Sequence, residues 1–265
     1  PDPMGAHTAG LGVVIAAALA AGARGLVITV GGSASTDGGT GALRALGTRF
    51  LDDDGAELPY GGAALARLGR IDRSRLLEPP AAGVEILTDV TNPLLGRLGA
   101  AHVYGPQKGA TTAEIDELDA GLTRLAELLG GEPGAPGAGA AGGTAYGLAA
   151  AWGASILPGA HRVAELAGLA ATLSGADLVI TGEGRFDATS AQGKVVGTVV
   201  DYAHAAGDVP VALVAGTVDA PLPPGITTHE DLTRLAGSTA AASTEPERWL
   251  EHAGAALAAR TTTHP

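Results

Sequence analysis

The chain has 265 residues, of which 46% are hydrophobic, and it carries 16 basic against 28 acidic side chains. These values describe a globular chain of one or two domains that can bury a sizeable core, and they exclude a disordered protein. Because the chain has no cysteine, a disulfide framework, a thiolate nucleophile and a zinc–thiolate site are excluded. The same feature is compatible with a reducing location, and we expect a cytoplasmic protein.

The charge and hydropathy patterns exclude two further classes of partner. A formal net charge of −12 and an aromatic content of 3% do not provide the clustered basic and stacking side chains of a nucleic-acid surface. The apolar stretch at residues 11–23 is interrupted by Gly12 and Gly22, so it cannot span the roughly 20 residues of a bilayer core. It also lacks a basic leading region, which excludes a signal peptide. We therefore expect neither nucleic acid nor a membrane as a partner.

Short apolar runs rich in β-branched residues predict buried parallel strands, and each run leads into a loop or a helix-forming segment. They cover residues 25–30, 84–90, 176–181 and 209–215. Alternation of such strands with helices predicts an α/β fold with a mainly parallel sheet. Thr111 and Glu114 predict a capped helix start. The apolar face of that helix comprises Ile115, Leu118, Leu122, Leu125 and Leu129.

Residues 130–143 read GGEPGAPGAGAAGG and break any regular element. Two interpretations are open. The segment is either a flexible linker or domain boundary, or a loop in which the backbone must approach a ligand.

The first candidate loop covers residues 31–39 and follows a predicted strand. Ligands of parallel α/β folds bind at the carboxyl ends of strands, and a helix N-terminus favours anions. Gly31 and Gly32 permit close backbone approach, Ser33 offers a hydroxyl, and Asp37 could hold a metal or accept a proton. The alternative is that the polar side chains of this loop cap the next helix. No Walker A pattern or nucleophile elbow is present in the sequence.

The second candidate loop follows the strand predicted at residues 84–90. Asp89 and Asn92 offer oxygen ligands for Mg²⁺ or for substrate hydroxyls. Gln107 and Lys108 precede the capped helix, where a lysine can act as a point charge for phosphate. An ordinary exposed lysine is the alternative.

The third candidate loop contains Gly182, Glu183, Arg185 and Asp187, followed by Lys194. Its carboxylates could hold Mg²⁺ or take an alcohol proton, and its cations could neutralise charge on a transferring phosphoryl group. A structural cluster of ion pairs is the alternative.

In order and spacing, the segments at residues 31–47, 89–111, 136–143 and 176–194 resemble the bacterial glycerate kinase family. The resemblance implies an ATP- and Mg²⁺-dependent kinase that phosphorylates D-glycerate, generally to 2-phosphoglycerate. It also implies two α/β domains, one inserted in the other, with a cleft between them. Residues 1–159 would then be mostly the inserted domain, and residues 160–265 the C-terminal part of a flavodoxin-like, Rossmann-like domain.

The resemblance also implies a set of site residues, whose roles are hypotheses. Asp187 or Asp89 is the candidate base or metal ligand, with Glu183 as a further metal ligand. Arg185 and Lys194 are the candidate clamps for the glycerate carboxylate or phosphate. The substrate- and phosphate-binding set comprises Gly31, Gly32, Ser33, Asp37, Asn92, Gln107, Lys108, Gly182 and Glu183.

Two features depart from the resemblance. Family members begin with a strand and an Asp-Ser-Phe-Lys type loop, which this chain does not contain, so we expect an incomplete record, a truncated product or a remnant. The family's usual Gln-Thr in the segment at residues 176–194 is replaced by Ala188-Thr189-Ser190. The alternatives to glycerate phosphorylation are therefore another small hydroxy-acid or sugar-acid kinase, or a catalytically inactive remnant. The oligomeric state is open, with a homodimer as one alternative.

Overall fold

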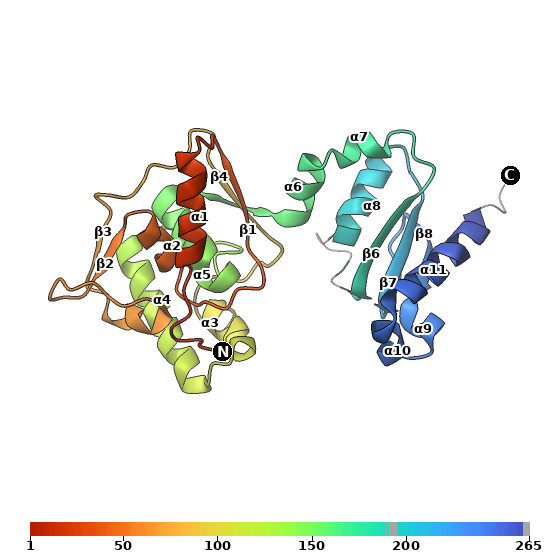
Figure 1. Cartoon of the computed structure of the whole chain (residues 1–265). Coiled ribbons are helices and arrows are strands. Elements are labelled where there is room, and N and C mark those ends of the chain that lie inside the picture. Colours follow the sequence, from red (N-terminus) through yellow and green to blue (C-terminus); the bar gives the residue numbers. More distant parts are fainter. Residues whose placement is uncertain (189, 191–194, 262–265) are drawn as a thin grey trace. The chain divides into compact units, whose positions relative to one another are not determined.

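The computed structural model describes residues 1–188, 190 and 195–261 (Figure 1). The chain divides into two compact units, Pro1–Gly159 and Ala160–Pro265. The main sheet of each unit is parallel, which confirms the prediction of an α/β fold with mainly parallel strands. Among the described residues, no helix is both long enough and apolar enough to cross a bilayer.

The first unit is built on a three-stranded sheet in the order β1–β4–β5. The strands are β1 (Leu26–Thr29), β4 (Val84–Thr88) and β5 (Ser155–Pro158). The central strand β4 carries the fully buried Ile86, which pairs with Ile28 and Ile156 on its two neighbours. This β-branched, apolar centre explains why the sequence pattern predicted β1 and β4, whereas the short strand β5 was not predicted.

Helices and a small ribbon complete the first unit. They are α1 (Ala9–Ala20), α2 (Thr40–Ala45), β2 (Arg49–Leu51), the 3₁₀ turn η1 (Gly62–Arg67), β3 (Arg70–Asp72), α3 (Ala100–Tyr104), the 3₁₀ turn η2 (Pro106–Lys108), α4 (Thr112–Leu129) and α5 (Ala140–Trp152). Strands β2 and β3 pair antiparallel. One hydrophobic core joins these elements, with Leu43, Phe50 and Tyr146 among its largest buried side chains.

The predicted helix after Thr111 is confirmed as α4. The Thr111 hydroxyl accepts from the Glu114 backbone N–H, and the Glu114 carboxylate accepts from the Thr111 backbone N–H at 2.7 Å. This reciprocal pair satisfies N–H groups that the first helical turn leaves without a partner. All five residues of the predicted apolar face are buried in the core.

The glycine-rich segment at residues 130–143 lies inside the first unit, so the interpretation as a domain boundary is wrong. The backbone of Ala141, Gly142 and Gly143 is left-handed, with φ of 51°, 65° and 86°. A Cβ atom on Gly142 would lie 2.0 Å from the carbonyl oxygen of Ser35. The glycine therefore allows this segment to pack directly against the loop that follows β1.

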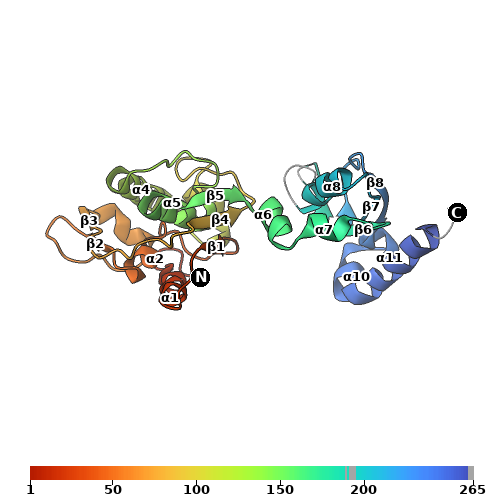
Figure 2. The same cartoon turned by 90° about the horizontal axis from the view of Figure 1, so that it is seen from above.

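The second unit is built on a three-stranded sheet in the order β6–β7–β8. Its elements are α6 (Gly159–Leu166), α7 (Leu169–Leu173), β6 (Val179–Phe186), α8 (Val195–Ala205), β7 (Val211–Val218), β8 (Ile226–Asp231), α9 (Leu232–Ala236), α10 (Thr239–Thr244) and α11 (Pro246–Thr261). Figures 1 and 2 show α8 and α11 on opposite faces of this sheet. On the α8 face Val196 packs with Phe186 and Leu213, and on the other face Leu232 packs with Ala253.

Strand β6 is longer than the sequence predicts. Glu183 pairs with Ala215 and Arg185 pairs with Thr217 on β7, so the pairing continues to Phe186. The prediction that residues from Gly182 onward form a loop is therefore wrong as far as Phe186. The backbone hydrogen bonds supplied by β7 outweigh the low strand preference of the glycines.

Candidate functional site

A cavity of about 270 Å³ opens in the first unit, at the carboxyl ends of β1 and β4. It is lined by Val30, Gly31, Gly32, Ser33, Thr88, Asp89, Val90, Tyr104, Gln107, Lys108, Ala141 and Gly142. The ends of β1 and β4, the region of η2 and the start of α5 thus bring together residues from four sequence segments. This is the position at which parallel α/β folds bind ligands.

The loop after β1 begins where the sheet pairing ends. The Val30 backbone N–H still donates to Leu87 O at 3.1 Å, and Gly31 and Gly32 follow at the rim of the cavity. Gly32 has a φ of 61°, which favours glycine. A Cβ atom at Gly31 would meet no atom within 4 Å, so packing does not require a glycine there. What the glycine provides is a backbone that is exposed to the cavity.

Lys108 is buried, with 8% of its surface exposed, and yet it lines the cavity. Its ammonium group donates to the carbonyl oxygen of Ser35 at 2.6 Å and lies 3.5 Å from the Thr36 hydroxyl. Burial lowers the pKa of Lys108 to about 8, and the nearby Asp37 carboxylate opposes that shift. Lys108 therefore holds the loop after β1 in place and supplies a positive charge at the cavity wall.

Asp37 is fully buried and is not among the residues that line the cavity. Its carboxylate accepts from the backbone N–H groups of Thr8, Gly39 and Gly41 at 2.9–3.1 Å, and from the Thr8 hydroxyl at 2.8 Å. These bonds anchor the start of α2 and the N-terminal segment to each other. Asp37 thus serves the fold, as the capping alternative expected, and we leave it out of the proposed ligand-binding set.

Asp89 and Asn92, both from the second candidate loop, lie in different settings. Asp89 lines the cavity, is exposed, and has no hydrogen-bond or ion-pair partner among the residues that the structure describes. Asn92 lies behind the lining: its amide nitrogen donates to Leu98 O at 2.8 Å, and its amide oxygen accepts from the Tyr104 hydroxyl at 2.6 Å. Tyr104 is a cavity residue that sequence reasoning missed, and burial raises the pKa of its hydroxyl.

In the second unit, Arg185 and Asp187 lie at the carboxyl end of β6. Arg185 Nε forms a salt bridge with Asp219 Oδ2 at 2.7 Å, and Asp219 directly follows β7. The Asp187 backbone N–H donates to the Ser190 hydroxyl at 3.0 Å, and its carbonyl oxygen accepts from the Ser190 N–H. The predicted residue Lys194 lies outside the described residues. Sequence reasoning missed Asp219, although its place after a strand is the signal that pointed to Asp89.

Glu183 and Gly182 line a separate groove of about 530 Å³, whose other walls are mostly apolar. Glu183 Oε1 is buried and has no hydrogen-bond partner in the part of the chain that the structure describes. A buried carboxylate oxygen without a partner is costly, so this atom fits a hydrogen-bond donor or a cation.

The donor set for a metal is sparse. Within residues 1–188, 190 and 195–261, no group of three or more His, Asp or Glu side chains could hold a metal ion. Mg²⁺ is commonly bound by one or two carboxylates, with substrate phosphates and water completing its shell. Asp89 and Glu183 each fit one such ligand.

Comparison with known proteins places these loops in one family. The profile of the Glycerate kinase family matches residues 1–262. The chain is 41% identical over 224 residues to the glycerate kinase of Halalkalibacterium halodurans, which covers 82% of this chain and 58% of the relative. It is 42% identical over 201 residues to the glycerate 2-kinase of Escherichia coli, which covers 73% of this chain and 52% of the relative.

The chain belongs to the glycerate kinase family. A solved structure, titled as that of a proposed glycerate kinase 2 from Salmonella typhimurium LT2, shares the fold with a TM-score of 0.76 and 36% identity. The similarity covers 98% of this chain and 71% of that one. The chain spans about 58% of the length of the first curated relatives it matches.

The glycerate kinase motifs contribute to the described sites unequally. In the first unit, Gly31, Gly32, Ser33, Asp89, Gln107 and Lys108 line one cavity. Asn92 lies behind that cavity, and Asp37 is bonded at the start of α2. The motif residues Gly182, Glu183, Arg185 and Asp187 belong to the second unit.

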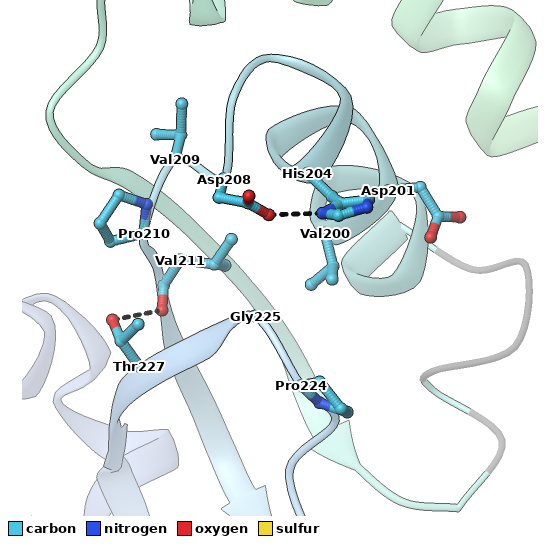
Figure 3. Close-up of a pocket in the computed structure, with 10 residues that line it drawn as sticks. All are labelled: Val200, Asp201, His204, Asp208, Val209, Pro210, Val211, Pro224, Gly225 and Thr227. Carbon is cyan, nitrogen blue, oxygen red and sulfur yellow. Dashed lines mark hydrogen bonds and ion pairs between the residues drawn. The ribbon is translucent and has the colours of Figure 1, made fainter.

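A larger cavity of the second unit, about 560 Å³, lies outside the glycerate kinase motifs. Figure 3 shows the His204 ring directed at Asp208, with Val200, Pro210 and Pro224 nearby. This cavity lies where β7 and β8 begin, at the opposite end of the strands from Arg185 and Asp219. Because ligands of parallel sheets bind at the carboxyl ends, it is not the candidate active site.

Proposed function

We propose that this protein is a glycerate kinase, which transfers a phosphoryl group from ATP to a hydroxyl of D-glycerate, with 2-phosphoglycerate as the expected product. The supporting observation is the small cavity at the ends of β1 and β4, which gathers the family's glycine, Asp89 and Lys108 positions. A volume of about 270 Å³ suits a three-carbon acid better than a large substrate. ATP-dependent chemistry on a metabolite of this size is also the basis for expecting a cytoplasmic location.

Lys108 and the loop after β1 would bind the negative charge of the substrate. The ammonium group is fixed by Ser35 O and the Thr36 hydroxyl, so it can offer its remaining donor to a carboxylate or phosphate oxygen without a large ordering cost. The exposed backbone of Gly31 and Gly32 allows an anion to come close to the peptide groups.

Asp89 is the candidate acceptor of the alcohol proton, because it lines the cavity and its carboxylate forms no hydrogen bond or ion pair with any described side chain. Asp89 also fits a Mg²⁺ ligand, as Glu183 does through its orphaned oxygen. When bound, Mg²⁺ would neutralise charge on the phosphates of ATP.

In the second unit, we propose Arg185 for binding phosphate and Asp187 as the alternative base. Arg185 is held by its salt bridge with Asp219, which fixes the guanidinium at the end of the strand. The role of Lys194 as a second clamp stays a prediction.

The test is D-glycerate-dependent ADP release from Mg-ATP, followed by ³¹P NMR of the product. We expect Asp89→Asn to lower kcat at least 100-fold, because general acid–base catalysis typically contributes 10²–10⁴-fold. Asp54→Asn, an exposed aspartate outside the cavity, is the matched control and should behave as the parent. Release with other hydroxy acids but not glycerate would instead support a related small-acid kinase.

A further inference from the structure

Tyr104 and Asn92 form a hydrogen-bonded pair at the wall of the proposed glycerate cavity. The Asn92 amide nitrogen donates to the carbonyl oxygen of Leu98 at 2.8 Å. Because a carbonyl oxygen accepts only from a donor, the NH₂ end of this amide must face Leu98. The amide oxygen of Asn92 therefore faces Tyr104.

This orientation determines what the Tyr104 hydroxyl can do. A tyrosine hydroxyl has one proton, and here that proton is donated to Asn92 Oδ1 at 2.6 Å. Burial raises the pKa of Tyr104, so the hydroxyl stays protonated near neutral pH. Toward any other group, the oxygen of Tyr104 can only accept a hydrogen bond.

Three polar groups of the cavity wall have a fixed hydrogen-bonding type. Asp89 and Tyr104 offer acceptors, and Lys108 offers a donor and a positive charge, whereas Ser33, Thr88 and Gln107 can donate or accept. An anionic oxygen placed against the Tyr104 oxygen could form no hydrogen bond with it, because both groups are acceptors. An alcohol O–H at the same place would donate a hydrogen bond to Tyr104. A ligand with a negative group and a separate alcohol satisfies both parts of the wall.

We propose that Tyr104 determines specificity by accepting a hydrogen bond from a substrate hydroxyl, in a state imposed by Asn92. This inference rests on the proposed function of the cavity and deepens it. The preferred ligand class is a small acid that carries at least one free alcohol group.

The test is calorimetric binding at pH 7 to the 265-residue chain. The probes are D-glycerate, 3-hydroxypropanoate, which lacks the 2-hydroxyl, and D-lactate, which lacks the 3-hydroxyl. We expect the parent to prefer D-glycerate over one of the two analogues, and Tyr104→Phe to reduce that preference by about three- to tenfold. Tyr60→Phe removes the hydroxyl of an exposed tyrosine that does not line the cavity, and it should leave the preference unchanged.

A second variant tests the orientation. Asn92→Ala leaves Tyr104 in place but releases its proton, so the hydroxyl can donate to an anion. We expect the same preference to fall in Asn92→Ala although the tyrosine is present, and urea unfolding verifies that the variant is folded.

The outcomes separate the inference from the function. If the parent binds D-glycerate and folded Tyr104→Phe discriminates as the parent does, the inference is wrong and the function stands. If Tyr104→Phe loses the preference but folded Asn92→Ala keeps it, the imposed orientation is wrong. If the folded parent binds none of the acids, the proposed function of the cavity fails, and this inference fails with it.

Discussion

Asp37 and Asp89 both belong to family motifs, yet the structure predicts opposite consequences for their removal. In Asp37→Ala, the buried backbone N–H groups of Gly39 and Gly41 and the part-buried N–H of Thr8 lose their acceptor, and so does the Thr8 hydroxyl. Each buried donor that is left without an acceptor typically costs about 1–3 kcal/mol of unfolding free energy, so we expect a total loss of about 2–5 kcal/mol. Asp89→Ala removes an exposed carboxylate without described partners, so its cost should stay within about 0.5 kcal/mol.

The two tryptophans allow this difference to be measured in the correct unit. Trp152 is buried in the first unit, and Trp249 packs in the second, so a Trp249→Phe background leaves a reporter in the first unit only. Urea unfolding followed by Trp152 fluorescence should show a much lower midpoint for Asp37→Ala and the parent midpoint for Asp89→Ala. If Asp37→Ala unfolds within 1 kcal/mol of the parent, the structural role assigned to Asp37 is refuted.

Three further changes have defined outcomes. Since burial lowers the pKa of Lys108 from 10.5 to about 8, its charge is lost as pH rises through 8, whereas in the unfolded chain it persists to about 10.5. Calorimetry should therefore show an affinity for D-glycerate that is steady below pH 7 and falls by up to about tenfold per pH unit above pH 8. The free energy of unfolding should rise between pH 8 and 10.5. An affinity that is unchanged at pH 9.5 would count against a binding role for Lys108. Gly142→Ala should lower the free energy of unfolding by about 1–3 kcal/mol, because the φ of 65° is strained for alanine and the new Cβ would meet Ser35 O. A variant that is as stable as the parent in urea would contradict that packing. Thr111→Ala removes the cap of α4 and should cost about 1 kcal/mol in the same assay, whereas no measurable loss would mean that the capping box is not needed.

The sequence predicted the parts of the fold that depend on local signals. In the first unit β1 and β4 show as β-branched runs, whereas β2, β3 and β5 were not predicted, and α4 shows as a capping pair followed by an apolar face. The end of β6 could not be predicted, because Gly182 and Gly184 look like loop residues and become strand only through pairing with β7. That pairing depends on a segment about 30 residues away in the chain.

The candidate site shows the same limit. The rule that ligands bind at strand ends located Gly31, Asp89 and the neighbourhood of Lys108. It could not decide whether Asp37 faces a ligand or the fold, because the deciding partner, Thr8, is 29 residues away. Tyr104 was missed because nothing in the sequence shows that its hydroxyl meets Asn92.

The most direct test of the proposed activity is ADP release from Mg-ATP in the presence and absence of D-glycerate. It should be measured on the 265-residue chain and on a version extended to the full length of its relatives, each with its Asp89→Asn variant. We expect glycerate-dependent ADP release from the 265-residue chain or, if not from that chain, from the extended version. Asp89→Asn should lower the rate of release at least 100-fold. Folded parents that release no ADP in response to D-glycerate, in either length, would contradict the assignment as a glycerate kinase.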